Sequence, residues 1–185
     1  MLTALSDPRC AEHKLAMDAL PDAQHQAVFI MLLLHVLSRG SEHEGVSVAL
    51  RHLAGTICKN SVAIFAQGTA SSSAVPQGPL IEALHGALLR SLQDPSLEIR
   101  KAAASLLGKV VDSYPHPYWA PIVPHLVGVL QLHCEDHTQG HIEALDGALT
   151  AVTFMCEDAS EKVGGALVTP TRFLLLSTRP FRTEY

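Results

Sequence analysis

The sequence is poor in aromatic residues and in charge. Only 5% of its 185 residues are Phe, Trp or Tyr, and 17% are charged. Strand-based folds draw on aromatic and β-branched residues, so few aromatics with many Leu and Ala indicates helices packed on helices. The chain is also not basic, because its formal net charge is −5. We therefore expect no nucleic-acid partner.

Long hydrophobic runs and a leader are missing too. The longest apolar run starts at Ala27 and ends at Leu34, well short of the roughly 20 residues that a membrane-spanning helix needs. No basic-then-apolar segment opens the chain, so we expect neither a signal peptide nor a membrane association. The cysteines lack C-x-x-C spacing, which is typical of reduced thiols in an intracellular protein. They are Cys10, Cys58, Cys134 and Cys156.

Motifs of catalysis are absent as well. The sequence contains no G-x-S-x-G, no P-loop and no H-E-x-x-H, and we expect neither an enzyme nor a cofactor. One cluster has metal-ligand residue types, namely His133, Cys134, His137 and His141. A turn through Gly140 would disperse these ligands, so we expect no metal.

The clearest helical pattern lies between Asp94 and Asp112. Asp94-Pro95 is turn chemistry, Ser96 suits an N-cap, and Glu98 lies where the helix dipole favours an anion. Apolar residues then recur with the spacing of one broad helix face. These are Ile99, Ala102, Ala103, Leu106, Leu107, Val110 and Val111.

Further helices are predicted on both sides of this stretch, over residues 9–20, 21–38, 44–60, 79–92, 118–133 and 141–158. The second of them is apolar nearly all round, so we expect it to be buried on more than one side. The last is expected to turn Ile142, Leu145, Leu149, Val152 and Cys156 inward. Residues 66–78 are rich in Gly and Ser and predict a flexible loop.

The predicted helices form pairs around turns near Asp7, Glu42, Asp94 and Asp136, at intervals of 35, 52 and 42 residues. HEAT repeats are helix pairs of about 40–47 residues, and the loop at 66–78 accounts for the long middle interval. A turn of the Asp94-Pro95 type before an Ile-Arg-containing helix resembles the second helix of such a repeat. We therefore predict an all-α solenoid of about three to four HEAT repeats over residues 1–161.

Several segments resemble the N-terminal repeats of the importin-β superfamily, most closely its transportin branch. Residues 53–62 are similar to the end of the second repeat, and residues 97–100 to the third. Residues 118–126, Tyr-Trp-Ala-Pro-Ile-Val-Pro-His-Leu, resemble the helix that opens the fourth repeat. Asp146-Gly147-Ala148, followed by Cys-Glu-Asp at residues 156–158, resembles its partner helix. Family members are several-fold longer, and the match stops before residues 162–185.

The resemblance implies an N-terminal fragment of a nuclear import receptor that shuttles between cytoplasm and nucleus. Its inner helices would bind the small GTPase Ran in its GTP form, and the full-length receptor would also contact nuclear pore proteins and cargo proteins. The cargo-binding arch lies beyond the matched repeats. The candidate Ran-binding residues are Arg51, Lys59, Glu98, Lys101, Lys109, Glu143, Asp146 and Glu157.

Two further expectations concern the C-terminal part of the chain. Residues 131–161 hold seven acids and no Lys or Arg, and such an acidic strip would attract a basic partner. Residues 162–185 offer one short apolar run between glycines and prolines, so we expect a poorly packed tail. A generic HEAT scaffold for a multi-subunit assembly remains the alternative function.

Overall fold

The computed structural model describes residues 1–9, 12–23, 26–39, 46–70, 78–133 and 142–157. Its regular structure is entirely helical, and none of the described residues forms a strand, which confirms the predicted all-α class. A final helix spans residues 142–157. The other elements are α1 (Leu2–Ser6), α2 (His13–Ala23), α3 (Ala27–Leu37), α4 (Val48–Ala70), α5 (Gly78–Ser91), α6 (Leu97–Ser113), the 3-10 turn η1 (His116–Tyr118) and α7 (Ile122–His133).

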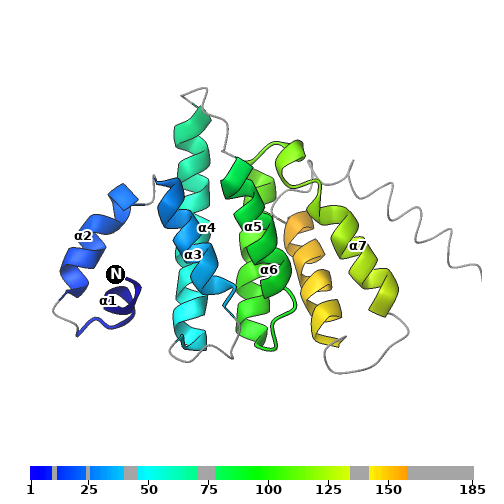
Figure 1. Ribbon diagram of the computed structural model, residues 1–185, viewed down its shortest axis with the longest axis horizontal. Helices are drawn as coiled ribbons and strands as arrows, with labels where there is room; N and C mark the ends of the chain where they lie inside the picture. The colour runs from blue at the N-terminus through cyan, green and yellow to red at the C-terminus, as the bar shows by residue number, and fades with distance from the viewer. Residues whose placement is uncertain (10–11, 24–25, 40–45, 71–77, 134–141, 158–185) are drawn as a thin grey trace, which may run out of the picture.

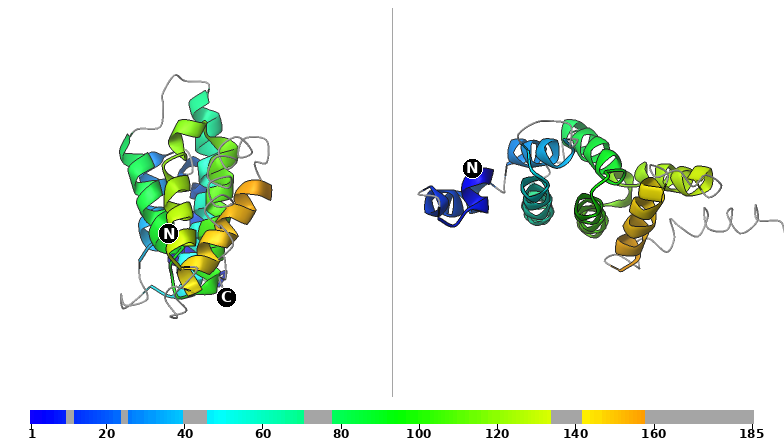
Figure 2. Two further views of the ribbon diagram at one scale, coloured as in Figure 1. Left: turned by 90° about the vertical axis from the view of Figure 1, so that its right-hand side faces the viewer. Right: turned by 90° about the horizontal axis from the view of Figure 1, so that it is seen from below.

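The larger helices lie in antiparallel pairs placed side by side. Figure 1 shows the pairs α3–α4, α5–α6 and α7 with helix 142–157, in chain order. The right-hand panel of Figure 2 shows two layers, with α3, α5 and α7 in one and α4, α6 and helix 142–157 in the other. Within each layer neighbouring helices pack across the pairs, since α3 contacts α5 and α4 contacts α6. We call the layer that contains α4, α6 and helix 142–157 the α4–α6 layer.

The core runs between the two layers, and α6 lies at its centre. Ile99, Leu106 and Leu107 are fully buried, as the apolar periodicity of this helix predicts. The whole predicted face is inside, together with Ala104 and Gly108. Full burial of a Leu or Ile stabilises the fold by about 1.5–3 kcal/mol, so this helix contributes more to the core than either of its neighbours along the chain.

The turn before α6 begins the helix in a slightly different way from the prediction. Ser96 is the N-cap residue, but its hydroxyl donates to Glu98 Oε2 at 2.8 Å instead of capping a backbone N–H. Asp94 stabilises the turn instead, because its Oδ1 accepts a hydrogen bond from the Ser96 N–H at 3.0 Å. The hydroxyl of Ser96 and the N–H of Glu98 lower the pKa of the Glu98 carboxyl, with smaller contributions from His52 and Lys101.

Two predicted boundaries are wrong. Pro21 was expected to open a helix, but it lies inside α2, and α3 starts only at Ala27. α4 continues to Ala70, so the loop predicted over 66–78 is helical at its start, and Gly78 already belongs to α5. Both predictions rested on local signals, namely a proline that suits a helix start and a Gly- and Ser-rich run that suits a loop. A helix anchored by tertiary packing can extend through a few such residues. Residues 71–77 lie outside the described part of the chain.

The connection between α6 and α7 is held by aromatic side chains. Trp119 is buried, and its Nε1 donates to the Tyr114 carbonyl at 3.3 Å. His85 on α5 lies 2.6 Å from the Tyr118 carbonyl through its Nε2. These contacts fold the segment into η1, so α7 begins at Ile122 rather than at Tyr118 as predicted. Pro124 consequently falls in the first turn of α7, where a missing N–H costs nothing.

The helix over 142–157 turns a different face inward from the predicted one. Its buried residues are mostly small, namely Ala144, Gly147, Ala148, Ala151 and Met155. The predicted inward face is wrong for Ile142, Leu149 and Cys156, which are exposed, the first two to 47% and 52%. Leu145 and Val152 of the same face are partly buried. A Cβ on Gly147 would lie 1.8 Å from the Leu92 carbonyl oxygen. The helix therefore sits so close to the α5–α6 turn that only small side chains fit between them.

The apolar helix α3 is buried on more than one side, as predicted. Ile30, Leu33, Leu34 and Leu37 are buried, and the helix packs against both α4 and α5. Its outer side, where Leu32 is 59% exposed, has no further described helix against it. None of the described helices has the length and apolar character needed to cross a membrane.

Two of the four cysteines can be placed. Cys58 is a buried free thiol whose pKa is raised strongly by desolvation, whereas Cys156 is an exposed free thiol. Cys10 and Cys134 lie outside the described residues, as does the predicted tail over 162–185. The inert thiol of Cys58 is a small hydrophobic residue of the core.

Candidate functional site

All eight candidate partner-binding residues lie on the α4–α6 layer. Arg51 and Lys59 come from α4, while Glu98, Lys101 and Lys109 come from α6. The helix over 142–157 carries the remaining three, namely Glu143, Asp146 and Glu157. The fold thus collects on one layer residues that are up to about a hundred positions apart in the chain. They differ sharply in exposure and in the partners they already have.

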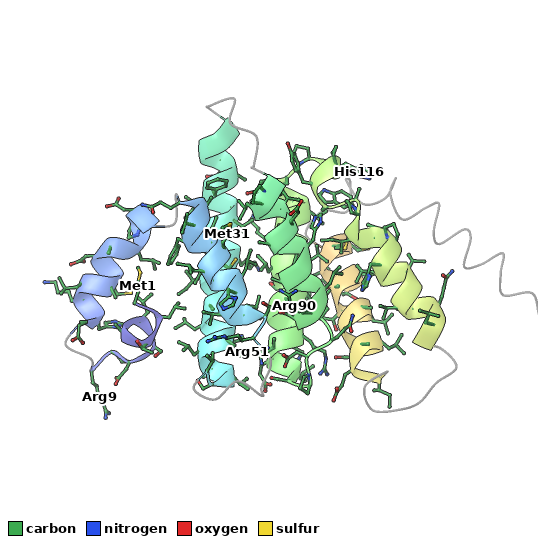
Figure 3. The ribbon with its side chains drawn as sticks, viewed as in Figure 1. Met1, Arg9, Met31, Arg51, Arg90 and His116 are labelled. Carbon is green, nitrogen blue, oxygen red and sulfur yellow. The ribbon has the colours of Figure 1, made fainter. Side chains whose placement is uncertain are left out.

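Arg51 cannot contact a partner, and its assignment to the binding surface is wrong. Its side chain is 1% exposed at the end of α4 nearest the close of α3 (Figure 3). Its Nε and Nη2 donate to the Leu37 carbonyl at 3.1 and 3.0 Å, and Nη2 also bonds to Asp94 Oδ2. Asp94 is itself buried. The guanidinium therefore joins three elements inside the protein: α3, α4 and the α5–α6 turn.

Asp146 has a structural partner as well. Its Oδ2 accepts from Arg100 Nε at 2.8 Å, and Arg100 Nη1 donates to the carbonyls of Asp94 and Pro95 at 2.8 and 3.0 Å. The Arg100 side chain is 9% exposed, whereas that of Asp146 is 42% exposed. A residue that binds a partner should have a side chain free to face solvent. Asp146 is half-exposed, and its charge is paired with the guanidinium because helix 142–157 packs directly on α6.

The two arginines occupy equivalent positions. Arg51 is the fourth residue of α4, and Arg100 is the fourth residue of α6. Each donates to a carbonyl at the end of the preceding helix or turn, and each pairs with a carboxylate supplied by the next helix pair. We call this set the arginine ladder. The sequence carried a signal for it, since residues 48–51 and 97–100 share an apolar-x-apolar-Arg pattern.

The other candidates are more accessible. Glu98, Lys101 and Glu157 are exposed. Lys109 is partly buried, and its Nζ pairs with Asp112 Oδ2 at 2.7 Å, one turn further along α6. Glu143 is partly buried. A partner lying on this layer would therefore meet Glu98, Lys101 and Glu157 first, before any residue of the arginine ladder.

Lys59 and Lys101 line a groove of about 290 Å³, which also takes a wall from Phe154 on the helix over 142–157. Lys59 Nζ donates to Ser105 Oγ at 2.7 Å, so α4 and α6 are bridged within the groove. A volume near 300 Å³ lies at the lower limit for small-ligand sites. The groove has room for one or two side chains of a partner.

The predicted acidic strip and the predicted metal-type cluster can be followed only in part. Glu135, Asp136, Asp158 and Glu161 of the strip lie outside the described residues, and so do Cys134, His137 and His141. His133 is the last residue of α7. The described residues hold no group of three or more His, Cys, Asp or Glu that is placed to bind a metal.

Comparisons of the chain with protein-family models, with curated proteins and with solved structures gave no match.

Proposed function

We propose that this chain is the N-terminal HEAT-repeat segment of an importin-β-like nuclear import receptor that binds Ran in its GTP form. Three stacked helix pairs with the arginine ladder support the repeat architecture. A repeated polar contact at equivalent helix positions is what a stack of similar units produces, because each unit meets its neighbour in the same way. This observation carries the proposal, together with the quoted sequence resemblance.

The residues behind the resemblance have clear packing roles. Trp119 and Leu126 of the first motif are buried. In the second motif, Asp146 pairs with Arg100, and Gly147 lies against the Leu92 carbonyl. These motifs therefore support the proposed repeat architecture, but they do not bear on GTPase binding. The GTPase half rests on the exposed charges of the α4–α6 layer, where Lys101 and Glu157 lie on neighbouring helices.

A generic HEAT scaffold is the second candidate function. The same packing roles favour it, because a scaffold of this class needs the ladder and the close helix contacts but no GTPase surface. Both candidates share one architecture, so only binding separates them. Nuclear pore proteins and cargo would be further partners of a complete receptor, which would shuttle between cytoplasm and nucleus.

The test is binding of immobilised Ran, loaded with a non-hydrolysable GTP analogue or with GDP, to the full chain. We expect the GTP form to bind more tightly, because the γ-phosphate orders the switch segments of a GTPase. Binding should weaken as salt is raised, since the Debye length falls from about 10 Å at 0.1 M to about 3 Å at 1 M.

Charge-reversal variants then locate the surface. Lys101→Glu combined with Glu157→Lys should lower the affinity about tenfold or more, the equivalent of about 1.4 kcal/mol. Lys14→Glu on the exposed side of α2 is the matched control, because it lies outside the α4–α6 layer. Equal binding of the two nucleotide forms, or no binding by the unchanged chain, would reject the GTPase proposal in favour of the scaffold.

A further inference from the structure

The groove between α4, α6 and helix 142–157 is a cationic feature of an acidic chain. Lys59 and His52 enter it from α4, and Lys101 enters it from α6. The chain as a whole has a formal net charge of −5. Two lysines and an exposed histidine around one depression therefore form a local reversal of the overall charge.

Neither ammonium group has a carboxylate in direct contact within the described part of the chain, although the Glu98 carboxylate, whose pKa is lowered chiefly by the Ser96 hydroxyl, lies near enough to Lys101 for that cation to lower its pKa further. Neither Lys59 nor Lys101 forms a salt bridge with a described residue, and Lys59 Nζ bonds to the uncharged hydroxyl of Ser105. Glu98 is the nearby acid, one turn before Lys101 on α6, and it is fully exposed and bonded to Ser96 Oγ. By contrast, Lys109 on the same helix is paired with Asp112.

The rest of the groove is lined by small residues, two of them with hydroxyl groups, and by one aromatic side chain, that of Phe154. Gly55 and Ala102 form its floor, where a Cβ added to Gly55 would lie 3.2 Å from the Ala102 Cβ. Phe154 is partly buried and contributes the wall from helix 142–157. A ligand that fills this groove must combine an anion for the lysines with an apolar group for the aromatic wall.

We propose that this groove binds an acidic peptide segment of a partner protein. One carboxylate of the segment lies between Lys59 and Lys101, and a neighbouring apolar side chain lies against Phe154. Hydrogen bonds between an ammonium group and a carboxylate are shorter and stronger than those between neutral groups. A nucleic acid fits less well, because binding its backbone takes several neutralised phosphates and the chain is acidic outside the groove.

The groove lies on the surface proposed for the GTPase, because Lys59 and Lys101 line the groove and are also candidate Ran-binding residues. An acidic peptide can bind there whether or not Ran is the partner. The experiment below contains no GTPase, so failure of one proposal is distinguishable from failure of the other.

The test is fluorescence anisotropy of the full chain with a labelled peptide of repeating Glu-Glu-Phe units, compared with a Gln-Gln-Phe peptide. We expect the glutamate peptide to bind and the glutamine peptide to bind at least about tenfold more weakly. Binding of the glutamate peptide should fall as salt is raised. Equal binding of the two peptides would overturn the proposal.

Variants tie the binding to the groove. Lys59→Gln combined with Lys101→Gln should weaken the glutamate peptide about tenfold or more, whereas Lys109→Gln on the same helix should change it by less than about twofold. Lys59→Arg combined with Lys101→Arg should retain most of the binding, because the charge remains and the ability to donate to Ser105 is kept. Circular dichroism before and after heating checks that each variant is folded.

Three results would reject the assignment. One is a Lys109→Gln loss equal to that of the double variant, which would indicate a general charge effect. The second is failure of the arginine variant to bind although it is folded. The third is a single-stranded RNA that binds more tightly than the glutamate peptide in a manner dependent on Lys59 and Lys101, which would identify a nucleic-acid site instead.

Discussion

Arg100 Nε donates to Asp146 Oδ2 at 2.8 Å, and the same guanidinium holds two carbonyls of the α5–α6 turn. One side chain therefore joins its own helix pair to the next. Arg51 does the same one pair earlier, through the Leu37 carbonyl and Asp94. The two contacts differ in burial, because Asp94 is buried while the Asp146 side chain is 42% exposed.

Because of this difference in burial, we expect removal of the Asp94 carboxylate to cost more stability than removal of the Asp146 carboxylate. Asp94→Ala should lower the free energy of unfolding by about 3–5 kcal/mol, because it leaves the Arg51 charge buried and unpaired. Asp146→Ala should cost only about 0.5–1.5 kcal/mol, since solvent screens a half-exposed pair. Glu157→Ala, at an exposed position of the same helix as Asp146, should stay within about 0.5 kcal/mol. Urea denaturation followed by circular dichroism measures all three. Equal small losses for Asp94 and Asp146 would contradict this reading of the ladder.

Two glycines make a matched pair for helix packing. Gly147→Ala places a Cβ 1.8 Å from the Leu92 carbonyl oxygen, whereas a Cβ on Gly128 meets nothing within 4 Å. We expect Gly147→Ala to destabilise by about 1–3 kcal/mol or more, because neither the backbone of helix 142–157 nor that of the α5–α6 turn can shift cheaply. Gly128→Ala, inside α7, should stabilise by about 0.5–1 kcal/mol through the lower backbone entropy of the unfolded chain. Thermal unfolding of the two variants should therefore shift in opposite directions, and shifts of the same sign would contradict the close approach.

Tyr114 predicts an alkaline loss of stability. Desolvation, with a smaller contribution from Cys58, raises the pKa of the Tyr114 phenol to about 12 in the folded protein, against an ordinary value of 10.0. Below pH 10 the phenol is neutral in the folded and in the unfolded chain, so its contribution to the free energy of unfolding is fully present. Between pH 10 and about 12 only the unfolded chain ionises, so stability falls by up to about 2–3 kcal/mol.

The measurement is the urea midpoint as a function of pH above about 9. Tyr114→Phe should remove this component of the loss, while Tyr118→Phe, at a partly exposed position, should leave it in place. An unchanged alkaline slope in Tyr114→Phe would show that the loss comes from other groups.

The sequence was most informative where local periodicity and burial coincide. The face of α6 through Ile99 and Leu106 was predicted correctly because one uninterrupted apolar stripe had only one way to be buried. In helix 142–157 the pattern offered two stripes, one of leucines and one of alanines. The leucine stripe is the more hydrophobic of the two, but the close approach at Gly147 requires the stripe of small residues to face inward. That approach is a tertiary contact, which no local pattern contains.

The sequence indicated which helices carry the candidate residues, but it did not show which of those residues are buried and paired inside the protein. The candidates come from alternate helices of the chain, and the structure places those helices in the α4–α6 layer. The exposure of Arg51 was predicted wrongly. A charged residue at a helix start is normally exposed, and the sequence does not show that Arg51 has a buried partner in Asp94. The groove at Lys59 and Lys101 was beyond reach for the same reason, since its wall comes from Phe154, about fifty residues further along the chain.

The arginine ladder also sets an order of events during synthesis. Arg51 leaves the ribosome 43 residues before Asp94, and Arg100 leaves 46 residues before Asp146. At about 5–20 residues per second, each guanidinium waits about 2–9 s for its carboxylate. During that interval the end of the growing stack carries an uncompensated cation beside the apolar side chains that later pack against the next pair. A hydrated charge at this edge disfavours premature association between chains on the same messenger.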